Sequence, residues 1–513
     1  MKKHGGKEEM GGTGTMTASR PLNARYGPPI AEKLEAPRRM RTMSRHGIFE
    51  PRGINAPRSR FHERGTFGRL FPSLPAFLPD PQQLLELGKP GGVMDPAAEQ
   101  NVDNPATSAG FTFLGQFIDH DITFDPTSHL EQQNDPEAIA NFRTPVLELD
   151  SVYGAGPAAQ PQLYDNRPDK LGKLLIDDAA PNDLPRNSQN TAVIGDPRND
   201  ENVIVSQLHV AFIKFHNAVV DRLESEGVSA RDRFERAQQL VRWHYQWIVL
   251  HEFLPHIVGQ DMVDAVLAAP HDRSKKDKHR NGARGERKFF KWRNEPFIPV
   301  EFAVAAYRFG HSQVRPFYRL NAGFAAPLFD VNELGKPDPN DLSGGHRAAR
   351  RFVEWRRFFA NLGAAGDLQQ SKRIDTVLSK PLFELPFIPA EQRRSLAQRN
   401  LLRGHSFSLP SGQAVACALE VDPLSPEDLE DVTDLGFDDE TPLWFYILRE
   451  ADKRADGKTL GPAGGRIVAE VLIGLLEGDR FSFLRANPRW TPTFGVGGKF
   501  GIADLLKFAG VAL

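Results

Sequence analysis

The stretch GQFIDHD, residues 115–121, ends an apolar segment with helical periodicity that begins near Ser108. At about 100° per residue, Gln116, Asp119 and His120 fall on one face of the predicted helix. Asp121 points elsewhere. Burying these polar groups costs free energy unless they have partners or a task. A buried histidine–aspartate pair is often structural, so this motif alone leaves both a structural and a functional interpretation open.

A second charged motif precedes the next long helical pattern. The segment GDPRNDE, residues 195–201, contains Arg198 and Glu201, which are three residues apart and can lie on one side of a helix start. Capping and the helix dipole explain acidic groups at that end. They do not explain Arg198, because a cation is unfavourable at a helix N-terminus. The arginine is therefore a candidate functional residue.

Two later helical segments repeat a polar pair at i, i+3 spacing. In YRFGH, residues 307–311, Arg308 and His311 share one face, and Gly310 leaves room for a close neighbour beside the histidine. Asn400 and Arg403 have the same spacing further along the chain. A lone histidine on an apolar face is usually a core residue, so a structural interpretation stays open here too.

Helical patterns dominate the sequence and predict a mainly α fold with little β-structure. Strand alternation is scarce, and no period of about 20–50 residues recurs that would indicate a solenoid. Residues 1–65 predict a disordered or extended N-terminal arm. Residues 66–513 are expected to form one large helical domain that starts with an irregular, proline-rich segment, 67–95. The segments with helical spacing are 108–122, 202–226, 232–258, 301–316, 389–404 and 460–476.

The composition limits the partners and the compartment. With 64 Lys and Arg against 66 Asp and Glu, the formal charge of −2 gives no general attraction to nucleic acid or an anionic membrane. Cys417 is the single cysteine, which excludes an internal disulfide bond. No run of roughly 18 apolar residues predicts a membrane span, and residues 1–29 lack the apolar core of a secretory signal. We expect a cytoplasmic protein, or one exported by a non-Sec route, and a solvated loop over the basic segment 273–293.

The four polar motifs together resemble the animal-type haem peroxidases of the peroxidase–cyclooxygenase superfamily. They occur in the family's order and with compatible spacing, and the resemblance runs from about Phe67 to the C-terminal region. It implies a single haem-peroxidase domain with haem b as its cofactor. It also implies that the protein reduces hydrogen peroxide and oxidises small donors such as iodide, bromide, thiocyanate or phenols. The oligomeric state stays open.

The resemblance assigns roles on both sides of the haem. It makes His120 the distal catalytic histidine, with Gln116 as its companion on the same helix, and Arg198 the distal arginine. It makes His311 the ligand of the haem iron and Asn400 the hydrogen-bond acceptor for that imidazole. The remaining cofactor-binding residues that it implies are Arg308 and Arg403, which pair with the haem propionates, and Asp119 and Glu201, which form ester bonds to the haem.

A calcium site is also implied beside the distal histidine. Asp121 matches the family's calcium ligand there. The loop of residues 144–150 would complete a cage of oxygen atoms, which suits a hard cation; its ligands are Thr144, the carbonyl of Val146, Glu148 and Asp150. Glu148 and Asp150 depart from the Asp and Ser of mammalian members, and a structural surface loop is the other interpretation.

Alternative functions fit parts of the sequence. Fatty-acid dioxygenases of this superfamily place a tyrosine three residues before the proximal histidine, where this chain has Arg308. Asn202 follows Glu201 where the chloride-oxidising branch has methionine, so chloride is not an expected donor. A metal-dependent phosphohydrolase could instead use the His120–Asp121 doublet with His209 and His216, but it would leave Arg198 unexplained. A haem-free scaffold is disfavoured because both distal groups and the iron ligand are present.

Overall fold

The computed structural model describes residues 65–95, 101–125, 133–136, 139–267, 287–292, 296–345, 349–363 and 367–511. All of these belong to one unit of the chain, Ser44–Leu513. The predicted N-terminal arm lies outside the described residues except for Gly65, and most of the basic segment 273–293 lies outside them as well.

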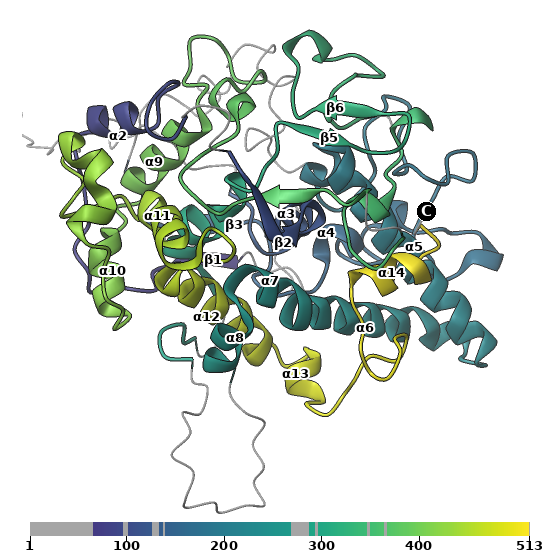
Figure 1. The fold of residues 1–513 in the computed structure, drawn as a ribbon. Coiled ribbons are helices and arrows are strands. Elements are labelled where there is room, and N and C mark those ends of the chain that lie inside the picture. Colours follow the sequence, from purple (N-terminus) through teal and green to yellow (C-terminus); the bar gives the residue numbers. More distant parts are fainter. Residues whose placement is uncertain are drawn as a thin grey trace, which may run out of the picture. The chain divides into compact units, whose positions relative to one another are not determined.

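Helices form most of the regular secondary structure of the described residues, with few strands (Figure 1), which confirms the predicted mainly α class. The longest, α5, packs on both α3 and α6, and Phe117 and Phe212 stack between α3 and α5 with ring centres 4.7 Å apart. The α-helices are α2 (Pro81–Leu87), α3 (Ala109–Ile122), α4 (Asp150–Tyr153), α5 (Val203–Ser225), α6 (Ala230–Ile248), α7 (Leu254–Val258), α8 (Gln260–Val266), α9 (Leu396–Ser406), α10 (Gly412–Ala418), α11 (Leu443–Ala455), α12 (Pro462–Gly478), α13 (Phe483–Ala486) and α14 (Ile502–Phe508).

The C-terminal helices complete the core. Helix α11 packs against α9, α10 and α12, and α12 in turn contacts α7, α8 and α13. Figure 1 shows α12 and α8 side by side, with α6 extending beyond them. Helix α14 returns to pack on α5. The chain therefore closes around α3 and α5, the two helices that carry or follow the first two polar motifs.

Strands are short and pair segments that are far apart in the sequence. They form three small sheets, ordered β3-β1-β4, β2-β7 and β5-β6. Strand β1 runs parallel to β4, which leads directly into the segment that carries His311. The strands are β1 (Gly65–Gly68), β2 (Asp103–Ser108), β3 (Ala140–Asn141), β4 (Phe297–Pro299), β5 (Phe317–Arg319), β6 (Ala325–Pro327) and β7 (Gln370–Lys372).

Three segments differ from the sequence prediction. The predicted helix 301–316 is a π turn, η8 (Glu301–Ala305), followed by a 3₁₀ helix, η9 (Ala306–His311), because Ala305 leaves helical geometry with φ −126° and ψ −73°. The predicted helix 389–404 begins only at Leu396, where Ser395 caps α9. The irregular segment 67–95 contains helix α2, which starts at a capping box on Asp80.

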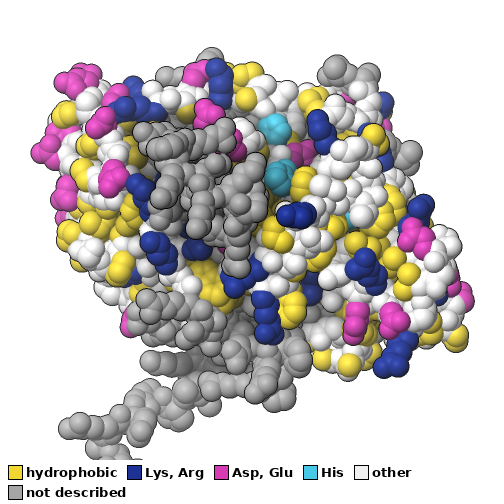
Figure 2. All heavy atoms as spheres, turned by 90° about the horizontal axis from the view of Figure 1, so that it is seen from below, with side chains coloured by type: hydrophobic (Ala, Val, Ile, Leu, Met, Phe, Trp, Pro, Cys, Tyr) yellow, Lys and Arg dark blue, Asp and Glu magenta, His cyan; other side chains and the backbone are white. Residues whose placement is uncertain are grey.

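Helix α5 is long and apolar enough to cross a membrane by length and composition, but 83% of its most apolar window is buried inside the protein. Polar residues such as His209 and His216 interrupt its apolar run, which is why the sequence did not indicate a span. On the face drawn in Figure 2, both basic and acidic side chains are visible, with most of the acidic ones toward the edges of the face.

Candidate functional site

Four segments that are far apart in the sequence line one cavity of about 370 Å³. They are α3, the 3₁₀ turn η6 (Pro197–Asp200) with the residue after it, η9 and α9. The cavity is partly apolar and holds a small number of convergent polar groups, as ligand sites usually do. Its wall contains every residue with a predicted role in catalysis or in haem binding: Gln116, Asp119, His120, Arg198, Glu201, Arg308, His311, Asn400 and Arg403.

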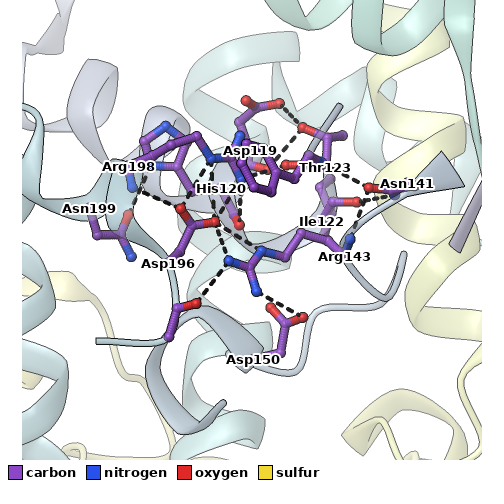
Figure 3. Close-up of polar contacts among 12 residues, drawn as sticks. Asp119, His120, Ile122, Thr123, Asn141, Arg143, Asp150, Asp196, Arg198 and Asn199 are labelled. Carbon is purple, nitrogen blue, oxygen red and sulfur yellow. Dashed lines mark hydrogen bonds and ion pairs between the residues drawn. The ribbon is translucent and has the colours of Figure 1, made fainter. Parts of the chain in front are cut away.

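His120 lies in the last turn of α3 and is only 4% exposed. Its Nδ1 lies 2.8 Å from Oδ1 of Asn199 in η6. The amide nitrogen of Asn199 lies 2.9 Å from Nδ1 of His209 on α5. Figure 3 shows the contact between Asn199 and His120. The buried Asn199 side chain therefore bridges a histidine in the cavity wall and a histidine in the core.

Arg198 is held along one side of its guanidinium group. Its Nη2 donates to the carbonyl oxygens of His120 (3.1 Å) and Thr123 (2.6 Å) and to Asp196 (2.8 Å), and its Nε donates to Asp196 at 3.2 Å. The group also lies 4.3 Å from the ring centre of Phe124. Nη1 makes no hydrogen bond to the residues that the structure describes. Its two N–H groups are therefore available to a ligand in the cavity.

The position of Arg198 depends on Asp196, a fully buried carboxylate. Asp196 caps η6 by accepting from the Arg198 backbone N–H at 2.8 Å, and it accepts from Nε (2.9 Å) and Nη2 (2.5 Å) of Arg143. Burial opposes ionisation, but the Arg143 and Arg198 guanidinium groups outweigh it and hold the pKa of Asp196 far below its usual range. Arg143 also reaches Asp150 at 3.5 Å (Figure 3). A chain of charges thus links Asp150, the first residue of α4, to Arg198.

His311 and Asn400 are in contact, but their roles differ from the expected ones. Nδ2 of Asn400 lies 2.7 Å from Nδ1 of His311, while Oδ1 of Asn400 accepts from Nη1 of Arg308 at 2.9 Å. Arginine can only donate, so the amide oxygen must face Arg308 and the amide NH₂ must face the imidazole. In this arrangement Nδ1 of His311 accepts a hydrogen bond, whereas the resemblance described above predicted that it donates one.

Three guanidinium groups, those of Arg308, Arg399 and Arg403, line the same cavity. Burial and the neighbouring Arg403 lower the pKa of Arg308 to about 10, and burial and Arg403 also lower the pKa of Arg399. Asp125 faces Arg403 at 3.8 Å. Cations that raise each other's free energy in this way suit a ligand that carries carboxylates.

The space beside His311 is open. A Cβ atom added at Gly310 would meet no other atom within 4 Å, as predicted from the sequence for this glycine.

Asp119 and Glu201 also lie in the cavity wall, and burial raises the pKa of Asp119 although Arg198 opposes the shift. Oδ1 of Asp119 accepts from the Thr123 hydroxyl at 2.8 Å.

The predicted calcium ligands come together only in part. Asp121 is fully buried, and neither of its carboxylate oxygens makes a hydrogen bond of ordinary geometry. Burial and the nearby Asp150 raise its pKa well above the usual value, and the Tyr245 hydroxyl and Leu149 N–H offset this only in part. Glu148 instead pairs with Arg242 at 3.6 Å. Among the described residues no three acidic, histidine or cysteine side chains converge as metal ligands.

The phosphohydrolase hypothesis finds no support at its two additional histidines. His209 is engaged by Asn199, and His216 lies 3.0 Å from the Tyr153 hydroxyl and 2.8 Å from the carbonyl of Gly172. Burial lowers the pKa of His209 to about 3 and that of His216 to about 4, so both are neutral core residues. Neither histidine lines the cavity.

Four residues of the site escaped the sequence argument. Capping explained Asp196 locally, and nothing in the sequence pairs it with Arg143. Asn199 follows Arg198 directly and could have been noticed as a polar residue at a buried helix start. Arg399 is one turn before Arg403 on α9, a spacing that indicates a shared face.

Comparisons with known proteins agree with this geometry. The family model described as animal haem peroxidase matches residues 127–434, which is more than half of the chain and includes Arg198, His311 and Asn400. Peroxidasin of Drosophila melanogaster is 23% identical over 408 residues, covering 70% of this chain. The alignment covers 24% of peroxidasin, so this chain corresponds to about a quarter of that relative.

Solved structures share the fold. Peroxidase A from Dictyostelium discoideum aligns with a TM-score of 0.61 at 17% identity, covering 86% of this chain and 93% of that one. The fatty acid alpha-dioxygenase of Oryza sativa aligns with a TM-score of 0.57 at 17% identity, covering 88% and 80%. By the family model and the arrangement of the four motifs around one cavity, this chain belongs to the animal haem peroxidase family.

Proposed function

We propose that this protein is a haem peroxidase that reduces hydrogen peroxide and oxidises small donors. The observation that carries the proposal is the convergence of His120 and Arg198 with His311 and Asn400 on one cavity. The residues also fit haem: there is an imidazole beside open space at Gly310, an apolar wall and a cluster of guanidinium groups. We infer that His311 holds the iron and that Arg308 and Arg403 hold the two carboxylates.

Bound haem would supply the iron that coordinates peroxide and the oxidising power. The chain's own task is then to move one proton and to stabilise charge. With peroxide in the cavity, Nε2 of His120 would accept a proton from one peroxide oxygen and return it to the other, which would leave as water. Nη1 of Arg198 would donate to the negative charge that develops as the O–O bond breaks. Because Asp196 fixes the guanidinium beforehand, little reorganisation is needed.

Two refinements belong to the same proposal. Asp119 and Glu201 are placed in the cavity wall, where esters to the haem can form. Acid–organic extraction after brief peroxide treatment should then fail to release free haem, and full release would mean that both are only polar neighbours. Calcium is proposed to bind Asp121 and Asp150 with oxygens of Thr144 and the Val146 carbonyl, because both oxygens of the buried Asp121 and Oδ1 of Asp150 lack a hydrogen-bond donor, although Oδ2 of Asp150 pairs with Arg143. Glu148 is left out of the ligand set because it pairs with Arg242.

The fatty-acid dioxygenase is the second candidate, since solved structures of fatty acid alpha-dioxygenases share the fold. The cavity chemistry favours the peroxidase. Arg308 occupies the position of the dioxygenase tyrosine, and the neighbouring Tyr307 donates its hydroxyl to the Gly115 carbonyl at 3.3 Å and stacks on Phe302. Oxygen consumption with an unsaturated fatty acid, measured on the haem-loaded protein, separates the two activities.

The deciding experiment is an absorption spectrum of the haem-supplemented protein before and after one equivalent of hydrogen peroxide. A Soret band that shifts within the mixing time and returns on adding iodide or a phenol supports the peroxidase. Replacing His311 by alanine should abolish most haem binding, and Arg198→Lys or His120→Ala should keep the haem but slow its reaction with peroxide. Absence of any Soret band in the wild type would refute the proposal.

A further inference from the structure

We propose that Asn199 and His209 are positioning residues that hold His120 in the tautomer whose Nε2 is unprotonated. The inference rests on the proposed function, because an unprotonated Nε2 matters only if His120 moves a proton. Neither Asn199 nor His209 belongs to the residues that the family resemblance assigned to the site.

The hydrogen bonds determine which nitrogen of His120 carries the hydrogen. Oδ1 of Asn199 lies 2.8 Å from Nδ1 of His120, and an amide oxygen can only accept. Nδ1 must therefore carry the hydrogen. A neutral imidazole has one N–H group, so Nε2 keeps its lone pair. That lone pair is what a general base needs.

The orientation of the Asn199 amide is fixed from its other end. Its NH₂ group lies 2.9 Å from Nδ1 of His209 and can only donate, so that nitrogen must be unprotonated. His209 is 1% exposed and burial lowers its pKa to about 3, so the ring is neutral, and accepting at Nδ1 places its one hydrogen on Nε2. If Nδ1 of His209 carried a hydrogen, the amide would turn over, its NH₂ would face His120, and Nε2 of His120 would be protonated. One amide thus couples the tautomers of two histidines.

A merely structural role fits Asn199 less well. Buried asparagine side chains most often satisfy backbone groups, as Asn141 does for the Ile122 carbonyl and the Phe124 N–H. Asn199 is fully buried, and each polar atom of its side chain bonds to one imidazole. These two bonds set the proton positions on the two rings and hold no backbone group in place.

The first test uses the haem-loaded protein and cyanide, which binds haem iron after its proton passes to a distal base. Association rates are measured between about pH 4 and 9 for Asn199→Leu, His209→Leu and Asn199→Asp, and for Asn199→Leu in a His120→Ala background. We expect Asn199→Leu to slow cyanide association and the peroxide reaction about 10- to 100-fold, with unchanged haem content. His209→Leu should act in the same direction. In the His120→Ala background Asn199→Leu should have no further effect.

The pH profile separates positioning from folding. The charged groups near His120 are unchanged in these variants, so a shift reports on residue 199; they are Asp196, Arg198, Asp119 and Glu201. Asn199→Asp should move the acid limb of the cyanide profile upward, because a carboxylate on Nδ1 stabilises the imidazolium. The matched control is His216→Leu, since His216 is equally buried on α5 but bonds to Tyr153 and Gly172. It should lower stability and leave the profile in place.

A second measurement needs no haem. In apoprotein with ¹³C,¹⁵N-labelled histidine, the resonance that disappears in His120→Ala should report an Nδ1–H tautomer, and Asn199→Leu should change it. An Nε2–H tautomer in the wild type would overturn the inference. So would an equal effect of Asn199→Leu with and without His120, or an unshifted profile in Asn199→Asp. A wild-type protein that takes up no haem would refute the proposed function, while the apoprotein tautomer would still decide this inference.

Discussion

Replacing Asp196 by asparagine removes the negative charge that Arg143 and Arg198 share. The side chain keeps its size, but one acceptor oxygen becomes an NH₂ group that faces arginine donors. Asp196 is fully buried and accepts from both guanidinium groups at 2.5 to 3.3 Å. Solvent therefore does not screen the loss of its negative charge. We expect a loss of stability and, in the haem-loaded protein, a misplaced distal arginine.

The magnitude follows from what the two arginines retain. Breaking a buried ion pair from one side typically costs about 3–5 kcal/mol. Arg143 keeps Asp150 at 3.5 Å and the Gly195 carbonyl at 3.1 Å, and Arg198 keeps the carbonyls of His120 and Thr123. These contacts place the expected loss near the lower end, about 3 kcal/mol. The exposed pair Arg167–Asp178 is the matched control, and Asp178→Asn should cost far less stability because solvent screens that pair.

The assay measures the free energy of unfolding of the apoprotein in urea at several pH values. Because the pKa of Asp196 is lowered in the folded state, its contribution is fully present above the unfolded pKa of about 3.9 and is lost as pH falls below it toward the folded pKa. The difference between Asp196→Asn and wild type should therefore be the same at about pH 8 and pH 5.5 and shrink near pH 3. A loss no larger than that of Asp178→Asn would refute the reasoning.

The same variant tests the link to function. Haem content should stay near the wild-type level, since Asp196 does not line the cavity. The reaction with peroxide should slow about 10- to 100-fold, because Arg198 then has to be ordered during the reaction. Lost stability with an unchanged rate would mean that Asp196 supports the fold and does not position Arg198.

Three shorter predictions concern other groups. Burial raises the pKa of Asp375 to about 7, so the folded state prefers its protonated form and loses stability as pH rises from about 4 to 7. Asp375→Asn should match wild type near pH 4 and be more stable at pH 8 by up to about 4 kcal/mol in urea unfolding, and a constant difference would contradict this. Arg403→Gln should weaken uptake of haem more than uptake of haem dimethyl ester, which lacks carboxylates, whereas the exposed Arg489→Gln should change neither; equal losses for both ligands would exclude a carboxylate contact. Added calcium should raise the urea midpoint of the wild type, Asp150→Asn should abolish the increase and Glu148→Gln should keep it, and the reverse order would restore the original ligand set.

The helices and the cavity residues could be predicted from the sequence for a physical reason. Polar groups such as His120 and Arg308 interrupt strongly apolar helical patterns, and burial makes them costly unless they converge on something. Arg143 could not be predicted, because it lies 53 residues before its partner Asp196 and nothing in the local sequence indicates that contact. The segment 301–316 was predicted to be an α-helix, since apolar spacing of three and four residues fits α, π and 3₁₀ geometry alike.

The 3₁₀ geometry of η9 helps to explain why Asn400 donates a hydrogen bond to His311, where the sequence predicted that it accepts one. In a 3₁₀ helix residues i and i+3 lie directly above one another, so Arg308 is stacked over His311 and reaches the same asparagine. Nη1 of Arg308 cannot serve both the Asn400 oxygen and a cofactor carboxylate with the same hydrogen. A carboxylate that draws Arg308 away frees that oxygen, and the Asn400 amide can then turn to accept from Nδ1–H of His311. An imidazole that binds a metal through Nε2 offers that N–H group. On the proposed function, recognition of the haem carboxylates by Arg308 would therefore be coupled, through Asn400, to the hydrogen bond at Nδ1 of His311.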